Sequence, residues 1–226
     1  MPFTAALFDL DGVIISTDIL HYRSWEVLTR EQGIPFSWEI NKRLLGVSRM
    51  QSLEIVLELA SKSYTDQEKQ ALADRKNAHY LQMVQQLTHD DLLPGALPFI
   101  SELRARGVRT AVCSGSRNAK VIVGQLQLTP LFDLIIDGND ITRTKPDPQI
   151  FLMAAERLGV SPANCLVIED AEVGVEAARR AGMRSLGIGD TKRLQAADLA
   201  AESISGISVE AVWELFDTGR TAGATG

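Results

Sequence analysis

The stretch FDLDGVI, residues 8–14, continues the short apolar run TAALF of residues 4–8 and carries two carboxylates, Asp9 and Asp11. An apolar run of this length predicts a buried strand that ends at the first aspartate. Two carboxylates in such a place repel each other and are costly to desolvate unless a cation or a shared proton lies between them. The stretch therefore predicts a buried strand that brings two acidic groups to a charged site.

Similar apolar runs recur along the chain and alternate with helical patterns. Such alternation is typical of a parallel sheet covered by helices, so we expect an α/β fold with a Rossmann-like parallel sheet. The predicted strands are residues 4–8, 109–113, 133–137, 165–169 and 184–188, and the helices between the later strands are residues 119–128, 148–159 and 172–182.

Residues 16–90 interrupt this alternation. Their apolar residues recur at spacings of three and four, with no strand pattern between them, which predicts an all-helical insert directly after the first strand. We therefore expect an α/β core formed by residues 1–15 and 91–226 and a helical cap formed by residues 16–90.

The composition is that of an ordinary soluble globular protein, with 226 residues, 45% hydrophobic and 23% charged. A net charge of −6 argues against a nucleic-acid or anionic-membrane surface as partner. We find no leader pattern and no apolar run long enough to span a bilayer, so we expect a cytoplasmic protein. Cys113 and Cys165 lie in apolar runs and are expected to be buried thiols rather than a disulfide.

Polar residues follow several of the predicted strands. Because ligands of open parallel sheets bind beyond the carboxyl ends of the strands, these residues are candidates for a site. They are Asp9 and Asp11 after the first strand, Ser114, Gly115, Ser116 and Asn118 after the second, Lys145 after the third, and Glu169 and Asp170 at the end of the fourth.

Each of these motifs also has an ordinary structural explanation. An Asp-x-Asp sequence can form a turn or a helix N-cap, Ser-Gly-Ser can be a plain loop, and Lys-Pro-Asp-Pro can be a rigid turn. The pair Glu169–Asp170 can cap the helix that follows it. The convergence of four carboxylates, one lysine and several hydroxyls at one sheet edge nevertheless favours a functional site.

The residue types in this cluster suit phosphoryl transfer. Carboxylate oxygens without neighbouring His or Cys favour Mg²⁺. Asp9 and Asp11 are two apart on an extended chain, so they face the same side roughly 6–7 Å apart. One can attack phosphorus while the other reaches the oxygen that leaves or enters. Lys145 would supply positive charge, and Ser114 would donate to phosphoryl oxygens.

The order and spacing of these motifs resemble the haloacid dehalogenase superfamily of phosphotransferases. The first motif of that superfamily matches Asp9-Leu10-Asp11-Gly12-Val13, the second matches Ser114, the third matches Lys145, and the fourth matches Glu169-Asp170. The resemblance implies the α/β core of that superfamily.

The helical insert resembles more narrowly that of the β-phosphoglucomutases. The resemblance rests on TDILHYRSWEVLTREQGI at 17–34, LLGVSRMQSLEIVLELA at 44–60 and ADRKNAHY at 73–80. It implies a cap that closes over a sugar phosphate.

The resemblance also implies a role for each matched residue. Asp9 would be the nucleophile that forms an aspartyl phosphate, and Asp11 the general acid and base. Mg²⁺ would bind Asp9, the backbone carbonyl of Asp11, Asp170 and the neighbourhood of Glu169. Arg49 would bind a second phosphate together with Ser116 and Asn118 beside Gly115, and Thr17, His21, Trp25, Gly46, Val47, Ser52 and Lys76 would contact the sugar or form the hinge.

The cap assignments also have plain alternatives. His21 and Trp25 lie one helical turn apart and can be core residues, and Arg49 and Lys76 can be solvated charges. The sequence departs from the family pattern at Ser16 and Leu45 and at Gly115 in the second motif. These departures affect the hinge and the fit of the sugar more than the phosphoryl transfer.

The implied activity is interconversion of β-D-glucose 1-phosphate and glucose 6-phosphate, with glucose 1,6-bisphosphate as intermediate and activator. A sugar-phosphate phosphatase of the same superfamily is the first alternative, and a catalytically inactive sugar-phosphate-binding protein is the second. Arg49 favours the mutase because a guanidinium suits a second phosphate. We expect a monomer with no nucleic-acid or membrane partner.

Overall fold

The computed structural model describes residues 3–44 and 46–221, and the chain divides into two compact units. The first unit, called the core, comprises Met1–Ser16 and Thr88–Gly226, and the second, called the cap, comprises Thr17–Leu87. The limits expected from the sequence differ by one residue at the first junction and by three at the second.

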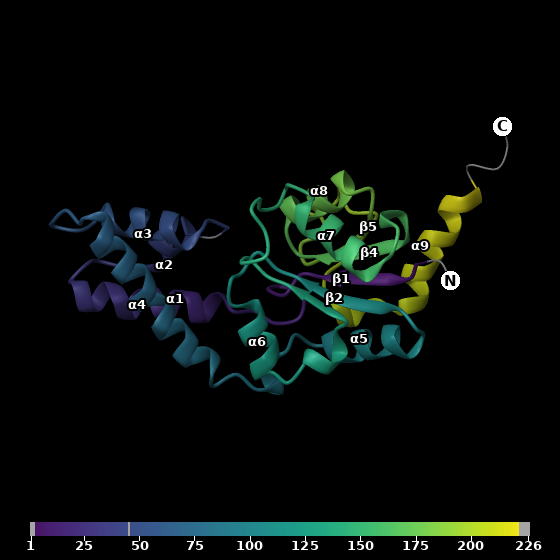
Figure 1. Cartoon of the computed structure of the whole chain (residues 1–226), viewed down its shortest axis with the longest axis horizontal. Coiled ribbons are helices and arrows are strands. Elements are labelled where there is room, and N and C mark those ends of the chain that lie inside the picture. The colour runs from purple at the N-terminus through teal and green to yellow at the C-terminus, as the bar shows by residue number, and fades with distance from the viewer. Residues whose placement is uncertain (1–2, 45, 222–226) are drawn as a thin grey trace. The chain divides into compact units, whose positions relative to one another are not determined.

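A parallel six-stranded sheet forms the centre of the core within the described residues (Figure 1), in the order β3-β2-β1-β4-β5-β6. The expected α/β class is therefore confirmed. The third strand is shorter than predicted, and the sixth was not predicted. The strands are β1 (Ala5–Phe8), β2 (Arg109–Cys113), β3 (Leu134–Ile136), β4 (Cys165–Glu169), β5 (Arg184–Ile188) and β6 (Leu199–Ala201).

Helices cover both faces of this sheet, with α7 and α8 on one side and α5 and α6 on the other (Figure 1). Alternate residues of β1 explain both layers, because successive side chains of a strand point to opposite faces. Leu7 packs in a buried cluster with Phe151 of α7, whereas Phe8 meets Phe99 of α5 edge-to-face. The helices of the core are α5 (Ala96–Ala105), α6 (Ala119–Gln125), α7 (Gln149–Leu158), α8 (Glu172–Arg180) and α9 (Val209–Thr221), with 3₁₀ turns η1 (His89–Asp91), η2 (Thr129–Leu131), η3 (Pro162–Asn164) and η4 (Ile204–Gly206).

The register of the sheet aligns the carboxyl ends of its central strands. Phe8, the last residue of β1, lies beside Val112 of β2 and Ile168 of β4. On the far side of β2, Cys113 pairs with Ile136, the last residue of β3. Residues that follow these strands therefore emerge side by side at one edge.

The cap is all-helical, as its sequence predicted. Its helices enclose a small apolar core that includes Trp25, Leu28, Leu53 and Leu72. Two of the helices begin with reciprocal side-chain caps, Ser48 with Gln51 and Thr65 with Glu68, which satisfy backbone N–H groups that have no partner within the helix. The helices are α1 (Asp18–Gln32), α2 (Trp38–Lys42), α3 (Arg49–Leu57) and α4 (Asp66–Val84).

Cys113 and Cys165 are both buried free thiols, as expected. Burial raises the pKa of Cys165 to about 11 and that of Cys113 further, so both remain protonated at neutral pH. In the described part of the chain, no helix has the length and apolar character that crossing a membrane requires.

Candidate active site

Lys145 joins two carboxylates at the carboxyl edge of the sheet. Its Nζ donates to Asp9 Oδ1 at 2.5 Å and to the backbone carbonyl of Cys113 at 3.1 Å, and it also contacts Glu169 Oε1. All three charged side chains are largely buried, Glu169 most of all. Although burial opposes the charged form of Lys145, the Asp9 and Glu169 carboxylates raise the pKa of its amine above the usual value. The lysine is therefore held as an ammonium against the predicted nucleophile.

The loop after β2 is folded by its own hydroxyls. Ser114 Oγ accepts from the backbone N–H of Ser116, and Ser116 Oγ accepts from that of Asn118, both at 3.2 Å. Ser114 and Asn118 are almost fully buried. A hydroxyl that accepts a hydrogen bond can still donate its own proton, so both serines can donate hydrogen bonds to phosphoryl oxygens. Gly138 packs closely against the same loop. A Cβ on Gly138 would lie 2.3 Å from the carbonyl oxygen of Gly115, so this approach requires glycine at position 138.

The turn after β1 lies against the carboxylate of Asp170. Gly12 has φ +74°, and its N–H donates to the carbonyl of Ile15 at 2.8 Å, which tightens the turn. A Cβ on Gly12 would lie 2.1 Å from Asp170 Oδ2, so the carboxylate of Asp170 rests against this backbone. The turn requires glycine both for its dihedral angle and for this approach.

The predicted metal ligands fit a magnesium ion only in part. Within residues 3–44 and 46–221, no three Asp, Glu, His or Cys side chains converge to surround a metal by themselves. Glu169 Oε1 meets Lys145 and its Oε2 accepts from the Ala171 N–H at 3.3 Å, so both oxygens already have protein partners. Mg²⁺ commonly takes only one or two carboxylates and completes its shell with water and phosphate. The oxygens of Asp9, Asp170 and the Asp11 carbonyl suit that pattern, whereas Glu169 as a ligand stays a prediction.

The cluster carries an excess of negative charge. Asp9 and Glu169 share the ammonium of Lys145, and Asp11 and Asp170 add two further carboxyl groups just after β1 and β4. The charge of these five groups is 1 − 4 = −3 when all are ionised and −2 when Glu169, whose pKa burial raises to about 7, is protonated. Such a site would repel a phosphoryl group unless a further cation were bound. The chemistry of the donor set therefore agrees with a divalent metal.

In the cap, the structure brings His21, Trp25 and Lys76 together. Lys76 Nζ lies 2.8 Å from His21 Nδ1 and 5.1 Å from the centre of the Trp25 ring. Burial, then the charges of Lys76 and Arg49, lower the pKa of His21 to about 3. Burial and Arg49 lower the pKa of Lys76 to about 7. Trp25 is also part of the apolar core of the cap, so the packing explanation of this residue holds as well.

The other predicted cap residues lie on two short segments. Thr17 is buried at the start of α1, and its carbonyl accepts from the His21 N–H at 3.0 Å. Ser52 is buried in α3, whereas Val47 is exposed and Arg49, the first residue of that helix, is partly exposed. Gly46 has φ +74°, and Leu45 lies outside the described residues.

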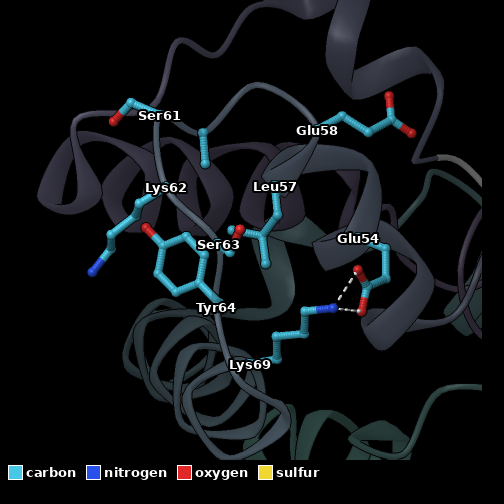
Figure 2. A pocket seen from close by; sticks show the side chains of 9 residues that line it. Glu54, Leu57, Glu58, Ser61, Lys62, Ser63, Tyr64 and Lys69 are labelled. Carbon is cyan, nitrogen blue, oxygen red and sulfur yellow. Dashed lines mark hydrogen bonds and ion pairs between the residues drawn. The ribbon is translucent and has the colours of Figure 1, made fainter.

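Two cavities were compared with the predicted site at the carboxyl edge of the sheet: one lies away from it, and the other borders it. One in the cap, of about 480 Å³, opens between the end of α3 and the start of α4 (Figure 2), and its Lys69 is paired with Glu54 at 2.8 Å. It contains none of the predicted site residues, so we do not assign the reaction to it. Another in the core, of about 330 Å³, borders Gly12 and Asp170 and continues past the ends of β5 and β6.

Tyr80, which was not predicted from the sequence, also belongs to the group formed by His21, Trp25 and Lys76 in the cap. Tyr80 is fully buried, and its ring stacks on His21 with centroids 4.3 Å apart. The available signal was its position one helical turn after Lys76, which places both on one face of α4.

The fold and the site agree with a known class of protein. A family model for haloacid dehalogenase-like hydrolases matches residues 3–182, and the chain belongs to this family. The β-phosphoglucomutase of Bacillus subtilis (strain 168) is 40% identical over 218 residues, which cover 96% of each chain. A crystal structure of β-phosphoglucomutase from Clostridium difficile covers 97% of this chain and 99% of its own, with 34% identity and a TM-score of 0.86. Within the class, the chain is therefore an enzyme of the β-phosphoglucomutase family, an intramolecular phosphotransferase.

A phosphatase is also among the similar proteins. The fructose-1-phosphate phosphatase of Escherichia coli (strain K12) is 30% identical over 190 residues, which cover 82% of this chain and 96% of that protein. The same fold thus supports transfer of a phosphoryl group to water in one relative and mutase activity in another.

Proposed function

We propose that this enzyme is a magnesium-dependent phosphomutase that interconverts β-D-glucose 1-phosphate and glucose 6-phosphate. The observation that carries the proposal is the buried contact of Lys145 with Asp9 at the sheet edge, in a chain similar over almost its whole length to a β-phosphoglucomutase. We further propose that the enzyme is a cytoplasmic monomer and that glucose 1,6-bisphosphate is its activator.

Asp9 and Asp11 would carry the covalent steps. Phosphorylated Asp9 would give its phosphoryl group to O6 of β-glucose 1-phosphate, while Asp11 takes the O6 proton, and glucose 1,6-bisphosphate would form. After the bisphosphate turns around, an oxygen of Asp9 would attack the phosphorus at C1, and Asp11 would return the proton to O1 as that P–O bond breaks. Glucose 6-phosphate would leave, and Asp9 would again be phosphorylated.

Lys145 and the loop after β2 would stabilise the transferring group. Because Lys145 binds Asp9 Oδ1, it orients the carboxylate and balances charge during attack. Ser114 would donate to a phosphoryl oxygen. Asp9, Asp170 and the backbone carbonyl of Asp11 would hold Mg²⁺, which when bound supplies positive charge to the phosphoryl oxygens.

The cap would select a phosphorylated acceptor over water. Arg49 would bind the second phosphate with two parallel hydrogen bonds, helped by Ser116 and Asn118. Closure of a cap excludes water and so protects the aspartyl phosphate from hydrolysis. The remaining proposed contacts to the sugar are Thr17, His21, Trp25, Gly46, Val47, Ser52, Lys76 and, beside the phosphate, Gly115.

A sugar-phosphate phosphatase is the second candidate, and similarity to the E. coli phosphatase supports it. Both activities share the attack of Asp9 on phosphorus and differ in what accepts the phosphoryl group from the enzyme. An inactive binding protein is less consistent with the buried ion pair of Asp9 and Lys145.

One assay separates these functions. Purified protein would receive Mg²⁺, β-glucose 1-phosphate and a trace of glucose 1,6-bisphosphate, and glucose 6-phosphate and free phosphate would be measured in parallel. The mutase predicts fast formation of glucose 6-phosphate with little free phosphate. Free phosphate that matches the loss of substrate would identify a phosphatase instead, and no product on either channel would contradict the assignment to glucose phosphates.

A further inference from the structure

Two pairs of side chains interlock inside the cap. His21 and Trp25 are four residues apart on α1, and Lys76 and Tyr80 are four residues apart on α4. This spacing places each pair on one face of its helix. The four side chains therefore form one compact cluster between the two helices.

The distances show that Tyr80 contacts both polar members of this cluster. The Tyr80 ring is nearly parallel to the His21 ring, with 26° between the planes and 4.3 Å between the centroids. The same ring has its centre 5.0 Å from Lys76 Nζ, and the Trp25 ring lies at 5.1 Å from that atom. Lys76 thus approaches two aromatic rings while its amine meets His21 Nδ1 at 2.8 Å.

Lys76 is a buried cation whose stabilisation depends on the aromatic rings beside it. Its side chain is 2% exposed, and no carboxylate in the described residues forms an ion pair with it. The charged or titratable neighbours that act on it are His21 on α1 and Arg49 on α3, and neither supplies negative charge. A buried cation without a carboxylate can be stabilised by aromatic faces, whose π-electrons attract it.

We infer that Tyr80 is a positioning residue, whose ring fixes the imidazole of His21 and the amine of Lys76 in one arrangement. The inference rests on the proposed function, because that function assigns His21 and Lys76 to the sugar phosphate. Tyr80 lies in the cap and acts through these two side chains. The ring provides the effect, so phenylalanine should replace tyrosine, whereas leucine should not.

The test compares Tyr80→Phe with Tyr80→Leu, and Phe36→Leu serves as the matched control. Phe36 also packs against the apolar core of the cap, but its ring contact is with Tyr22. Two properties are measured in each full-length protein. The first is the titration of the Lys76 amine by NMR in the absence of substrate, and the second is kcat/KM in the mutase assay.

Tyr80→Leu is expected to move the Lys76 titration downward by about one pH unit, because the aromatic face that stabilises the ammonium is lost while the amine stays in apolar surroundings. It should also lower kcat/KM about tenfold, the order of a desolvated cation–π contact. Phosphorylation of Asp9 by a small phosphoryl donor should be retained, because Asp9 and Lys145 belong to the core. Tyr80→Phe and Phe36→Leu should titrate like the wild type.

Two results would overturn the inference. In one, Tyr80→Leu leaves the Lys76 titration where it is in the wild type; in the other, Tyr80→Phe changes it as much as leucine does, which would transfer the effect to the hydroxyl. The titration does not depend on the identity of the substrate. A wild-type protein without mutase activity would therefore contradict the proposed function and still leave the positioning role testable.

Discussion

Replacing Gly174 by alanine should displace the Glu169 carboxylate and thereby disrupt the ion pairs of Lys145. Gly174 is the third residue of α8, and a Cβ there would lie 2.0 Å from Glu169 Cδ and 2.2 and 2.3 Å from the two carboxylate oxygens. Ordinary contact begins at 3.4 Å, so the carboxylate must retreat by 3.4 − 2.0 = 1.4 Å. Glu169 is 1% exposed and holds Lys145, so this movement disturbs the ion pair that orients Asp9.

Two opposing effects set the expected change in the free energy of unfolding. Disrupting a buried ion pair costs about 3–5 kcal/mol, whereas alanine in place of glycine in a helix gains up to about 1 kcal/mol. We therefore expect Gly174→Ala to lower the free energy of unfolding by about 2–4 kcal/mol. A displacement of about 1 Å near the reacting groups also predicts a roughly 100-fold slower phosphorylation of Asp9.

Gly124 provides the matched control. It lies in the last turn of α6, and a Cβ there would meet nothing within 4 Å. Gly124→Ala should leave phosphorylation unchanged and stabilise the protein slightly. The measurements are thermal melting and the rate of Asp9 phosphorylation by a small phosphoryl donor with Mg²⁺.

A second substitution tests whether the collision with the Glu169 carboxylate causes the loss of stability in Gly174→Ala. Glu169→Asp withdraws the carboxylate by about one carbon–carbon bond, 1.5 Å, which is close to the required retreat. In the Gly174→Ala background it should therefore cost less stability than in the wild type. The reasoning would be refuted if Gly174→Ala melted at or above the wild-type temperature and phosphorylated Asp9 at the normal rate.

Three further predictions concern the proposed roles. Asp11→Asn should slow transfer to the sugar by about 10²–10⁴-fold, because acid–base help is lost; single-turnover transfer from the phosphorylated enzyme measures this, and a near-normal rate would exclude the role. Arg49→Ala should lower mutase turnover much more than phosphorylation by a small donor, and equal losses in both assays would contradict the phosphate contact. The lowered pKa of Lys76, about 7 against 10.5, means that the unfolded chain binds its proton at higher pH than the native cap does. Cap stability should therefore rise from pH 7 to pH 9.5, by up to about 3 kcal/mol. Hydrogen exchange of α1 and α4 amides should show this rise in the wild type but not in Lys76→Met, and equal slopes in both would contradict it.

Several features of the fold could be predicted because they depend on local pattern. Apolar runs predicted five strands of the sheet, and their spacing predicted parallel order. β6 was missed because Leu199–Ala201 is a three-residue edge strand whose side chains are only half-buried. The helix expected over 119–128 ends at Gln125, and Gln127 adopts a φ of 54°, which helical periodicity does not signal.

The residues that follow the strands can be read from the order of apolar runs and polar residues along the chain, and a parallel sheet must bring such residues to one edge. Asp9, Lys145 and Glu169 could therefore be predicted as neighbours, although Asp9 and Lys145 are 136 positions apart in the sequence. That Lys145 pairs with both carboxylates could not be predicted in this way, because it depends on the path of the loop after β3. The contacts of Tyr80 with His21 and Lys76 likewise depend on the tertiary structure, since the packing of α1 on α4 sets which faces meet, and spacing along one helix carries no information about its partner.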